Sequence, residues 1–300
     1  MAATNTQTTN PVLQARQLSK RFGGLKAVAS VDFTITRHGV TSIIGPNGAG
    51  KSTFFNLVNG ALLPDSGTVV LEGEDITRLS PSKRLAKGMA RSFQITNLFS
   101  DLTVLDNLRL ACQFLEPKAS LLRPLKKSRI ADARCEELLR DFTLVTYASM
   151  RAGALSHGHQ RRLEIAMAMA TRPSLLLLDE PTQGMSHADT HETAQLIAAL
   201  CAHTTILLIE HDVDLVMTLS KKIMVMSQGA KLAEGSPEEI KGNPAVQTAY
   251  FGEAVSCCSH SMPYRFPSAS RIFFMASHCM CSQVRWSASS GAMGSARPPS

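Results

Sequence analysis

Short apolar runs recur along the chain, and each leads through a chemically distinctive residue into a helical pattern. The four clearest are VTSIIG at 40–45, SLLLLDE at 174–180, TTILLIEHD at 204–212 and KIMVMSQG at 222–229. Runs of this length, separated by helical segments, are typical of parallel strands joined by crossover helices. The pattern therefore predicts an α/β core.

A second pattern surrounds the first of these runs, where polar and apolar residues alternate with a period of two. It covers VLQARQL at 12–18, VASVDFTIT at 28–36 and GTVVLEGEDI at 67–76, with glycines in the turns. Such alternation predicts a small N-terminal antiparallel sheet beside the main one.

Residues 95–153 follow neither pattern and contain basic, leucine-rich stretches such as LLRPLKKSRIADARCEELLRDF. They predict a helical subdomain inserted into the α/β core. We therefore divide the chain into a frayed N-terminus at 1–11, one domain at 12–253 and an atypical tail at 254–300.

The composition limits the class of protein. The formal net charge is +7, but the tail holds four arginines and no acid or lysine, so the rest of the chain carries only +3. That excess is too small to argue for nucleic-acid binding. No apolar run approaches the roughly 18 residues that span a bilayer, and the N-terminus lacks the basic and apolar regions of a secretory signal. We expect a soluble cytoplasmic protein with reduced, scattered cysteines, whose membrane role would come through a partner.

The tail differs abruptly from the rest, with 12 serines, four of the seven cysteines and no acidic residue. Back-translation of residues 286–299 in a shifted frame can spell VSLVGRNGVGKTT, which is another phosphate-loop pattern. We therefore interpret the tail as either disordered or the product of a frameshift near Glu253 into a downstream gene. In both cases we predict that it is poorly packed and dispensable for nucleotide binding.

A phosphate loop is the strongest motif in the sequence. Residues 45–53 read GPNGAGKST, which satisfies G-x-x-x-x-G-K-[ST] between a strand pattern and a helical one. Glycines let backbone amides converge on an anion, and the following helix adds its positive end. Lys51 would reach the β- and γ-phosphates, and Ser52 would ligate Mg²⁺. The residues predicted to bind the nucleotide here are Gly45, Pro46, Asn47, Gly48, Ala49, Gly50, Lys51, Ser52 and Thr53.

Two acids end the leucine-rich strand, at the edge where α/β sheets place ligands. Asp179 suits a Mg²⁺ role, and Glu180 suits the general base that polarises the attacking water. His211 follows the next strand and could donate a hydrogen bond to the γ-phosphate. Taken alone, a histidine at a strand end favours a structural role, but the neighbouring motifs favour the functional one. Gln94 could bridge Mg²⁺ and the water. Phe22 could stack on adenine or be a core residue.

These motifs, in this order, resemble the ATP-binding cassette (ABC) of transporters over about 12–253. GPNGAGKST resembles the Walker A loop, Gln94 the Q-loop, LLLLDEP the Walker B strand and His211 the switch histidine. LSHGHQ at 155–160 lies where the family has its LSGGQ signature. Ser156 would cap a helix there and Gly158 would allow close approach, so that this helix N-terminus meets the γ-phosphate on a second cassette. The implied fold is a P-loop, RecA-like core with an antiparallel β-subdomain and a helical subdomain.

Finer resemblance is to the ATP-binding subunits of branched-chain amino acid importers, on segments such as RFGGLKAV, LLIEHDVDLVM and AEGSPEEIKGNPAVQTAYFGE. It implies ATP and Mg²⁺ as cofactors, and a peripheral position on the cytoplasmic face of the bacterial inner membrane. The implied partners are two permease subunits, a second ATPase subunit or another copy of this chain, and indirectly a periplasmic solute-binding protein. Leu98 and Phe99 would be exposed where a permease helix docks.

The sequence departs from the general family pattern at His157, His159 and Ser186, which puts full turnover in question. Three other functions stay open at this point. The first is an exporter cassette for lipid or lipopolysaccharide. The second is an ATP-gated structural subunit with weak hydrolysis. The third is a soluble ABC protein of ribosomes or DNA repair, although such proteins usually carry two cassettes or a long coiled coil.

Overall fold

The computed structural model describes residues 11–92, 98–115 and 129–251. The chain divides after Val246 into two units, and the description of the second covers only 247–251, at the end of the last helix. Everything that positions the site lies in the first unit.

The main sheet follows from the buried apolar runs. Among the described residues it has six strands in the order β10-β9-β3-β8-β7-β6. All neighbours are parallel except β10 and β9. The strands are β3 (Gly39–Ile44), β6 (Met89–Arg91), β7 (Leu175–Asp179), β8 (Thr205–Ile209), β9 (Ser220–Ser227) and β10 (Ala230–Gly235). Because β3, β8 and β7 are parallel neighbours, their carboxyl ends meet at one edge of the sheet.

The alternating segments form a second, antiparallel sheet in the order β2-β1-β4-β5. Its strands are β1 (Leu13–Phe22), β2 (Leu25–Ile35), β4 (Ser66–Leu71) and β5 (Glu74–Asp75). Phe22 pairs with Leu25 at the tip of the β1–β2 hairpin. Gly23 sits in that turn with a φ of 58°, which glycine adopts without a Cβ penalty.

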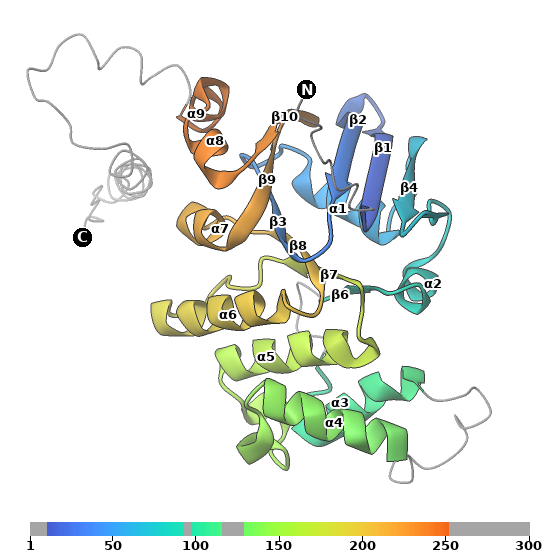
Figure 1. Cartoon of the computed structure of the whole chain (residues 1–300), viewed down its shortest axis with the longest axis vertical. Helices are drawn as coiled ribbons and strands as arrows, with labels where there is room; N and C mark the ends of the chain where they lie inside the picture. The colour runs from blue at the N-terminus through green and yellow to red at the C-terminus, as the bar shows by residue number, and fades with distance from the viewer. Residues whose placement is uncertain (1–10, 93–97, 116–128, 252–300) are drawn as a thin grey trace, which may run out of the picture. The chain divides into compact units, whose positions relative to one another are not determined.

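Helices connect the strands and cover the sheets (Figure 1). They are α1 (Lys51–Asn59), α2 (Pro81–Ala86), α3 (Val104–Cys112), α4 (Arg129–Asp141), α5 (His157–Ala168), α6 (His187–Leu200), α7 (Val213–Leu219), α8 (Pro237–Lys241) and α9 (Pro244–Phe251). Figure 1 shows α3, α4 and α5 grouped on the side away from β1, β2 and β4. No helix within the described ranges is long and apolar enough to cross a membrane.

Two apolar cores lie on opposite faces of the main sheet. Along β7, Leu175 and Leu177 belong to the core beneath α1 and the antiparallel sheet. Leu176 and Leu178 belong to the core shared with α3, α4, α5 and α6. Strand side chains alternate between faces, so a strand between two cores must be apolar at every position. This is why four leucines stand in a row.

Two strands were not predicted from the sequence. β6 has only three residues, too few for a periodic pattern to be read. β10, with the sequence AKLAEG, lies at the sheet edge and has no fully buried position. An edge strand faces one neighbour only, so its sequence carries less apolar signal.

Candidate nucleotide-binding site

The phosphate loop connects β3 to α1, and its shape requires glycine at two positions. A Cβ on Gly45 would lie 2.2 Å from the backbone oxygen of Met226, and one on Gly50 would lie 2.3 Å from that of Ala27. Both residues have positive φ, 152° and 94°. Gly50 is also the N-cap of α1, with no side chain to cap it. The amides of the first turn of α1 are therefore available to an anionic ligand.

Lys51 lies buried under this loop. Its Nζ donates to the backbone oxygens of Gly45 at 2.7 Å and Pro46 at 3.1 Å. Burial lowers the pKa of Lys51, and the nearby Glu180 carboxylate opposes that shift. An ammonium held only by carbonyls in a glycine-rich loop fits a phosphate ligand, since an anion would compensate its charge.

Asp179 ends β7 with its side chain almost fully buried. Arg91, at the end of the neighbouring β6, donates to the Asp179 carboxylate at 3.0 Å. Burial raises the pKa of Asp179, while the Arg91 guanidinium opposes the rise. A buried carboxylate at this sheet edge is the kind of oxygen donor that Mg²⁺ takes.

Glu180 and His211 meet in front of the sheet. Glu180 Oε1 and His211 Nε2 lie 2.8 Å apart, although the residues follow different strands, β7 and β8. The Glu180 backbone has a φ of 46°, uncommon for a residue with a Cβ. Its N–H donates to Ile209 O at 2.9 Å, so the strained turn is tied to the end of β8. The arrangement presents a carboxylate and an imidazole side by side, and either group can serve as a general base toward a water.

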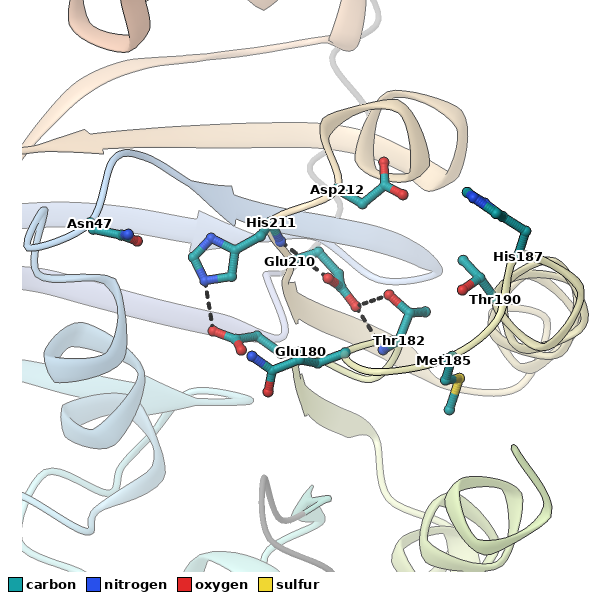
Figure 2. Close-up of a pocket in the computed structure, with 10 residues that line it drawn as sticks. Asn47, Glu180, Thr182, Met185, His187, Thr190, Glu210, His211 and Asp212 are labelled. Carbon is teal, nitrogen blue, oxygen red and sulfur yellow. Dashed lines mark hydrogen bonds and ion pairs between the residues drawn. The ribbon is translucent and has the colours of Figure 1, made fainter. Parts of the chain in front are cut away.

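These side chains line a pocket of about 530 Å³ shared by the phosphate loop and the segments after β7 and β8. Figure 2 shows Asn47 on the loop side, with Glu180 and His211 between it and Glu210. Its lining residues are Asn47, Glu180, Thr182, Gln183, Met185, His187, Thr190, Glu210, His211 and Asp212. The sequence prediction named three of them as site residues: Asn47, Glu180 and His211.

Sequence reasoning missed two charged residues of this region, Arg91 and Glu210. Arg91 lies on a strand too short to be recognised. Glu210 could be recognised in the sequence as an acid at a strand end, but from the sequence we assigned a role only to its neighbour His211. Its carboxylate is buried and accepts hydrogen bonds from Thr182 and from the His211 backbone.

The signature segment lies at the start of α5. Ser156 is the N-cap of α5 and accepts from the His159 N–H, which confirms its predicted local structure. Its Oγ also lies 2.7 Å from His159 Nδ1, and the His159 ring packs on Tyr147 at a centroid distance of 4.4 Å. Gly158 is buried, and a Cβ there would lie 2.7 Å from Asp189 Oδ1. This glycine therefore also allows α5 to approach α6 within the chain.

Other predicted residues have mixed outcomes. Phe22 is 47% exposed at the hairpin tip, with Lys20 Nζ 5.9 Å from its ring centre, so the core alternative is wrong. Phe99 is 55% exposed, as expected. Leu98 is a correction, because it is partly buried against the core beside α3. Gln94 and the tail lie outside the described residues.

In this site, a glycine-rich loop surrounds a buried lysine, and a carboxylate lies opposite it at the end of a parallel strand. This is the arrangement of a P-loop nucleoside triphosphatase. Comparison with known proteins narrows this class. The family model described as ABC transporter matches residues 28–183. The model described as branched-chain amino acid ATP-binding cassette transporter matches residues 230–256. The chain belongs to the ABC transporter family, on its branched-chain amino acid branch.

Comparison with individual relatives supports the same family assignment. The chain is 43% identical to the high-affinity branched-chain amino acid transport ATP-binding protein BraF of Pseudomonas aeruginosa, over 81% of this chain and 99% of BraF. It is 44% identical to LivG of Escherichia coli K12, with the same two coverages. A solved nucleotide-free ATP-binding cassette from an ABC transporter has a TM-score of 0.72 at 32% identity, covering 81% of this chain and 100% of its own. The predicted family, fold class and transport-coupled ATPase assignment are confirmed.

Proposed function

We propose that this chain drives import of branched-chain amino acids or related small polar solutes by hydrolysing ATP. The observation that carries the proposal is the 2.8 Å contact between Glu180 and His211, in the pocket shared with the phosphate loop. The names of the relatives support an importer over an exporter cassette, an ATP-gated structural subunit or a soluble ABC protein.

Each predicted site residue has a role in this proposal. The loop amides and Lys51 hold the β- and γ-phosphates, while Phe22 packs on the base. Glu180 accepts the proton of the attacking water, and His211 donates toward the γ-phosphate. Bound Mg²⁺ would neutralise phosphate charge, and the residues that would hold it are Ser52, Gln94 and Asp179.

The second cassette completes the site in this proposal. Ser156 and Gly158, at the α5 N-terminus, would face the γ-phosphate bound to the other subunit. A solved cassette at 25% identity, with a TM-score of 0.63 over 75% of this chain and 98% of its own, is described as dimeric with bound ADP and phosphate. The second subunit here would be a related ATPase or another copy of this chain.

Two permease subunits would dock on the helical side of the cassette. Phe99 and Leu102 are 55% and 37% exposed in the segment before α3, an apolar surface suited to a partner helix. Docking there would put the chain on the cytoplasmic face of the inner membrane, and a periplasmic binding protein would deliver solute from the other side. The proposal includes no nucleic-acid partner.

Co-purification of the chain with the permease and binding-protein products of neighbouring genes tests this function. In proteoliposomes, leucine, isoleucine or valine with the binding protein should stimulate Mg²⁺-dependent ATP hydrolysis, whereas an exporter would hydrolyse ATP independently of the binding protein.

Lys51→Ala should abolish nucleotide binding because the loop loses its only side-chain cation. Glu180→Gln should keep binding but reduce kcat by about a hundredfold or more, trapping an ATP-bound dimer. Unchanged nucleotide affinity in Lys51→Ala would refute the site.

A further inference from the structure

One buried carboxylate joins the segments that follow β7 and β8. Glu210 Oε1 accepts from the Thr182 backbone N–H at 2.9 Å and from its Oγ1 at 2.7 Å. The other oxygen, Oε2, accepts from the His211 N–H at 3.1 Å. Glu210 is only 4% exposed. Oxygens this buried need hydrogen-bond donors, and these donors come from both segments (Figure 2).

The two segments carry the two groups proposed to act on water. Thr182 lies two residues after Glu180, and His211 directly follows Glu210. The Glu180 N–H is in turn bonded to Ile209 O, the residue before Glu210. Glu210 therefore closes a loop of contacts that passes through both backbones. The 2.8 Å separation between Glu180 Oε1 and His211 Nε2 depends on those backbones keeping their spacing.

We propose that Glu210 is a positioning residue for ATP hydrolysis, which holds Glu180 and His211 in mutual register through Thr182 and the His211 backbone. This inference rests on the proposed function. Glu210 acts through its neighbours and needs no contact with the nucleotide. Small displacements of the reacting groups can lower kcat strongly. Phosphate binding depends on a different segment, the phosphate loop at 45–53.

Glu210→Gln tests the clamp with almost no change in shape. One amide oxygen can accept from Thr182 or from the His211 N–H, but the amide NH₂ then opposes the remaining donor. We expect kcat to fall about ten- to a hundredfold, while the Kd for ATP, measured with a fluorescent analogue, stays within about twofold. Thr182→Val should give a smaller loss and Thr182→Ser should restore activity. Glu136→Gln, on the exposed face of α4, is the matched control.

A double-mutant cycle separates positioning from general stabilisation. Rates are expressed per nucleotide-binding site, so misfolded protein does not count. In a His211→Ala background, Glu210→Gln should lower kcat by less than about threefold. The reason is that Glu210 holds Glu180 and His211 relative to each other, and one of these two side chains is already absent. If the two losses multiply fully, or Glu210→Gln keeps wild-type kcat, the inference is wrong. A wild-type chain without ATPase activity would instead overturn the proposed function itself.

Discussion

Among the single residues of the site, Asp179 has a side-chain pKa whose two largest influences oppose each other. Its side chain is buried at the end of β7, which raises its pKa, and Arg91 at 3.0 Å opposes the rise. Arg91 is itself held by Asn56 at 2.8 Å and lies over the Phe55 ring. The metal role proposed for Asp179 requires the ionised form, which the Arg91 guanidinium favours.

Arg91→Met removes the cation and keeps most of the stem that packs on Phe55. Because Arg91 lowers the pKa of Asp179, its loss raises that pKa further, and the carboxylate protonates at higher pH. The acid limb of the profile of kcat against pH should therefore shift to higher pH. Relative to the wild type, kcat should fall about tenfold in mild acid and less in mild alkali. Arg172→Met, at an exposed ion pair with Glu137, is the control. A pH-independent loss would contradict this account.

Among the elements, α3 carries one buried amide that organises residues 98–103, the described residues just before this helix. Asn107 is fully buried. Its Oδ1 accepts from the Phe99 N–H at 3.0 Å, and its Nδ2 donates to Phe99 O at 3.1 Å and Thr103 O at 2.9 Å. The Ala152 N–H and Gly153 N–H reach the same segment through Leu102 O and Ser100 O. The exposed ring of Phe99 is thus carried on a fixed backbone.

Replacing Asn107 by Ala should destabilise the protein by about 2–4 kcal/mol, because the Phe99 N–H loses its acceptor, the hydrogen bonds to Phe99 O and Thr103 O are lost, and a fully buried side chain is truncated. Thr103→Ala removes the N-cap bond of α3 and the hydrogen bond from the Thr103 hydroxyl to Asp106, and should cost about 1 kcal/mol. Urea denaturation followed by circular dichroism compares the two variants directly. Equal losses would mean that the amide does not organise this segment.

At the scale of the whole molecule, the region proposed to hydrolyse ATP ends before the tail begins. BraF and LivG are matched over 99% of their length by 81% of this chain. About a fifth of the chain therefore lies outside that match, and the branch-specific family model ends at residue 256, three residues into the predicted tail. The predicted domain limits stay a prediction, and they suggest residue 253 as the place to truncate the chain.

Ending the chain after Glu253 should leave the Kd for ATP within about twofold of the full-length value, since every proposed nucleotide contact lies upstream. Fluorescence titration of both proteins measures this. A marked loss of affinity would show that the tail contributes to the nucleotide site. Sequencing the coding DNA tests the origin of the tail, because the frameshift hypothesis requires a second cassette N-terminus in the alternative frame.

Local sequence was sufficient for most of the elements, though not for β6 and β10, and for the chemistry at their ends. Period-two alternation, the four leucines of β7 and GPNGAGKST each encode their structure over a few neighbouring residues, because backbone preference and side-chain burial act locally there. Lys51, Asp179, Glu180 and His211 were recognisable for this reason.

Only the tertiary structure decided which of those ends meet. The order β3-β8-β7 brings residues 45, 179 and 211 to one edge, although they are far apart along the chain. The same packing joins Arg91 to Asp179, Glu210 to Thr182, and Gly158 to Asp189. A lone arginine, glutamate or glycine has no local signature for such contacts, because they arise when distant segments share one buried volume.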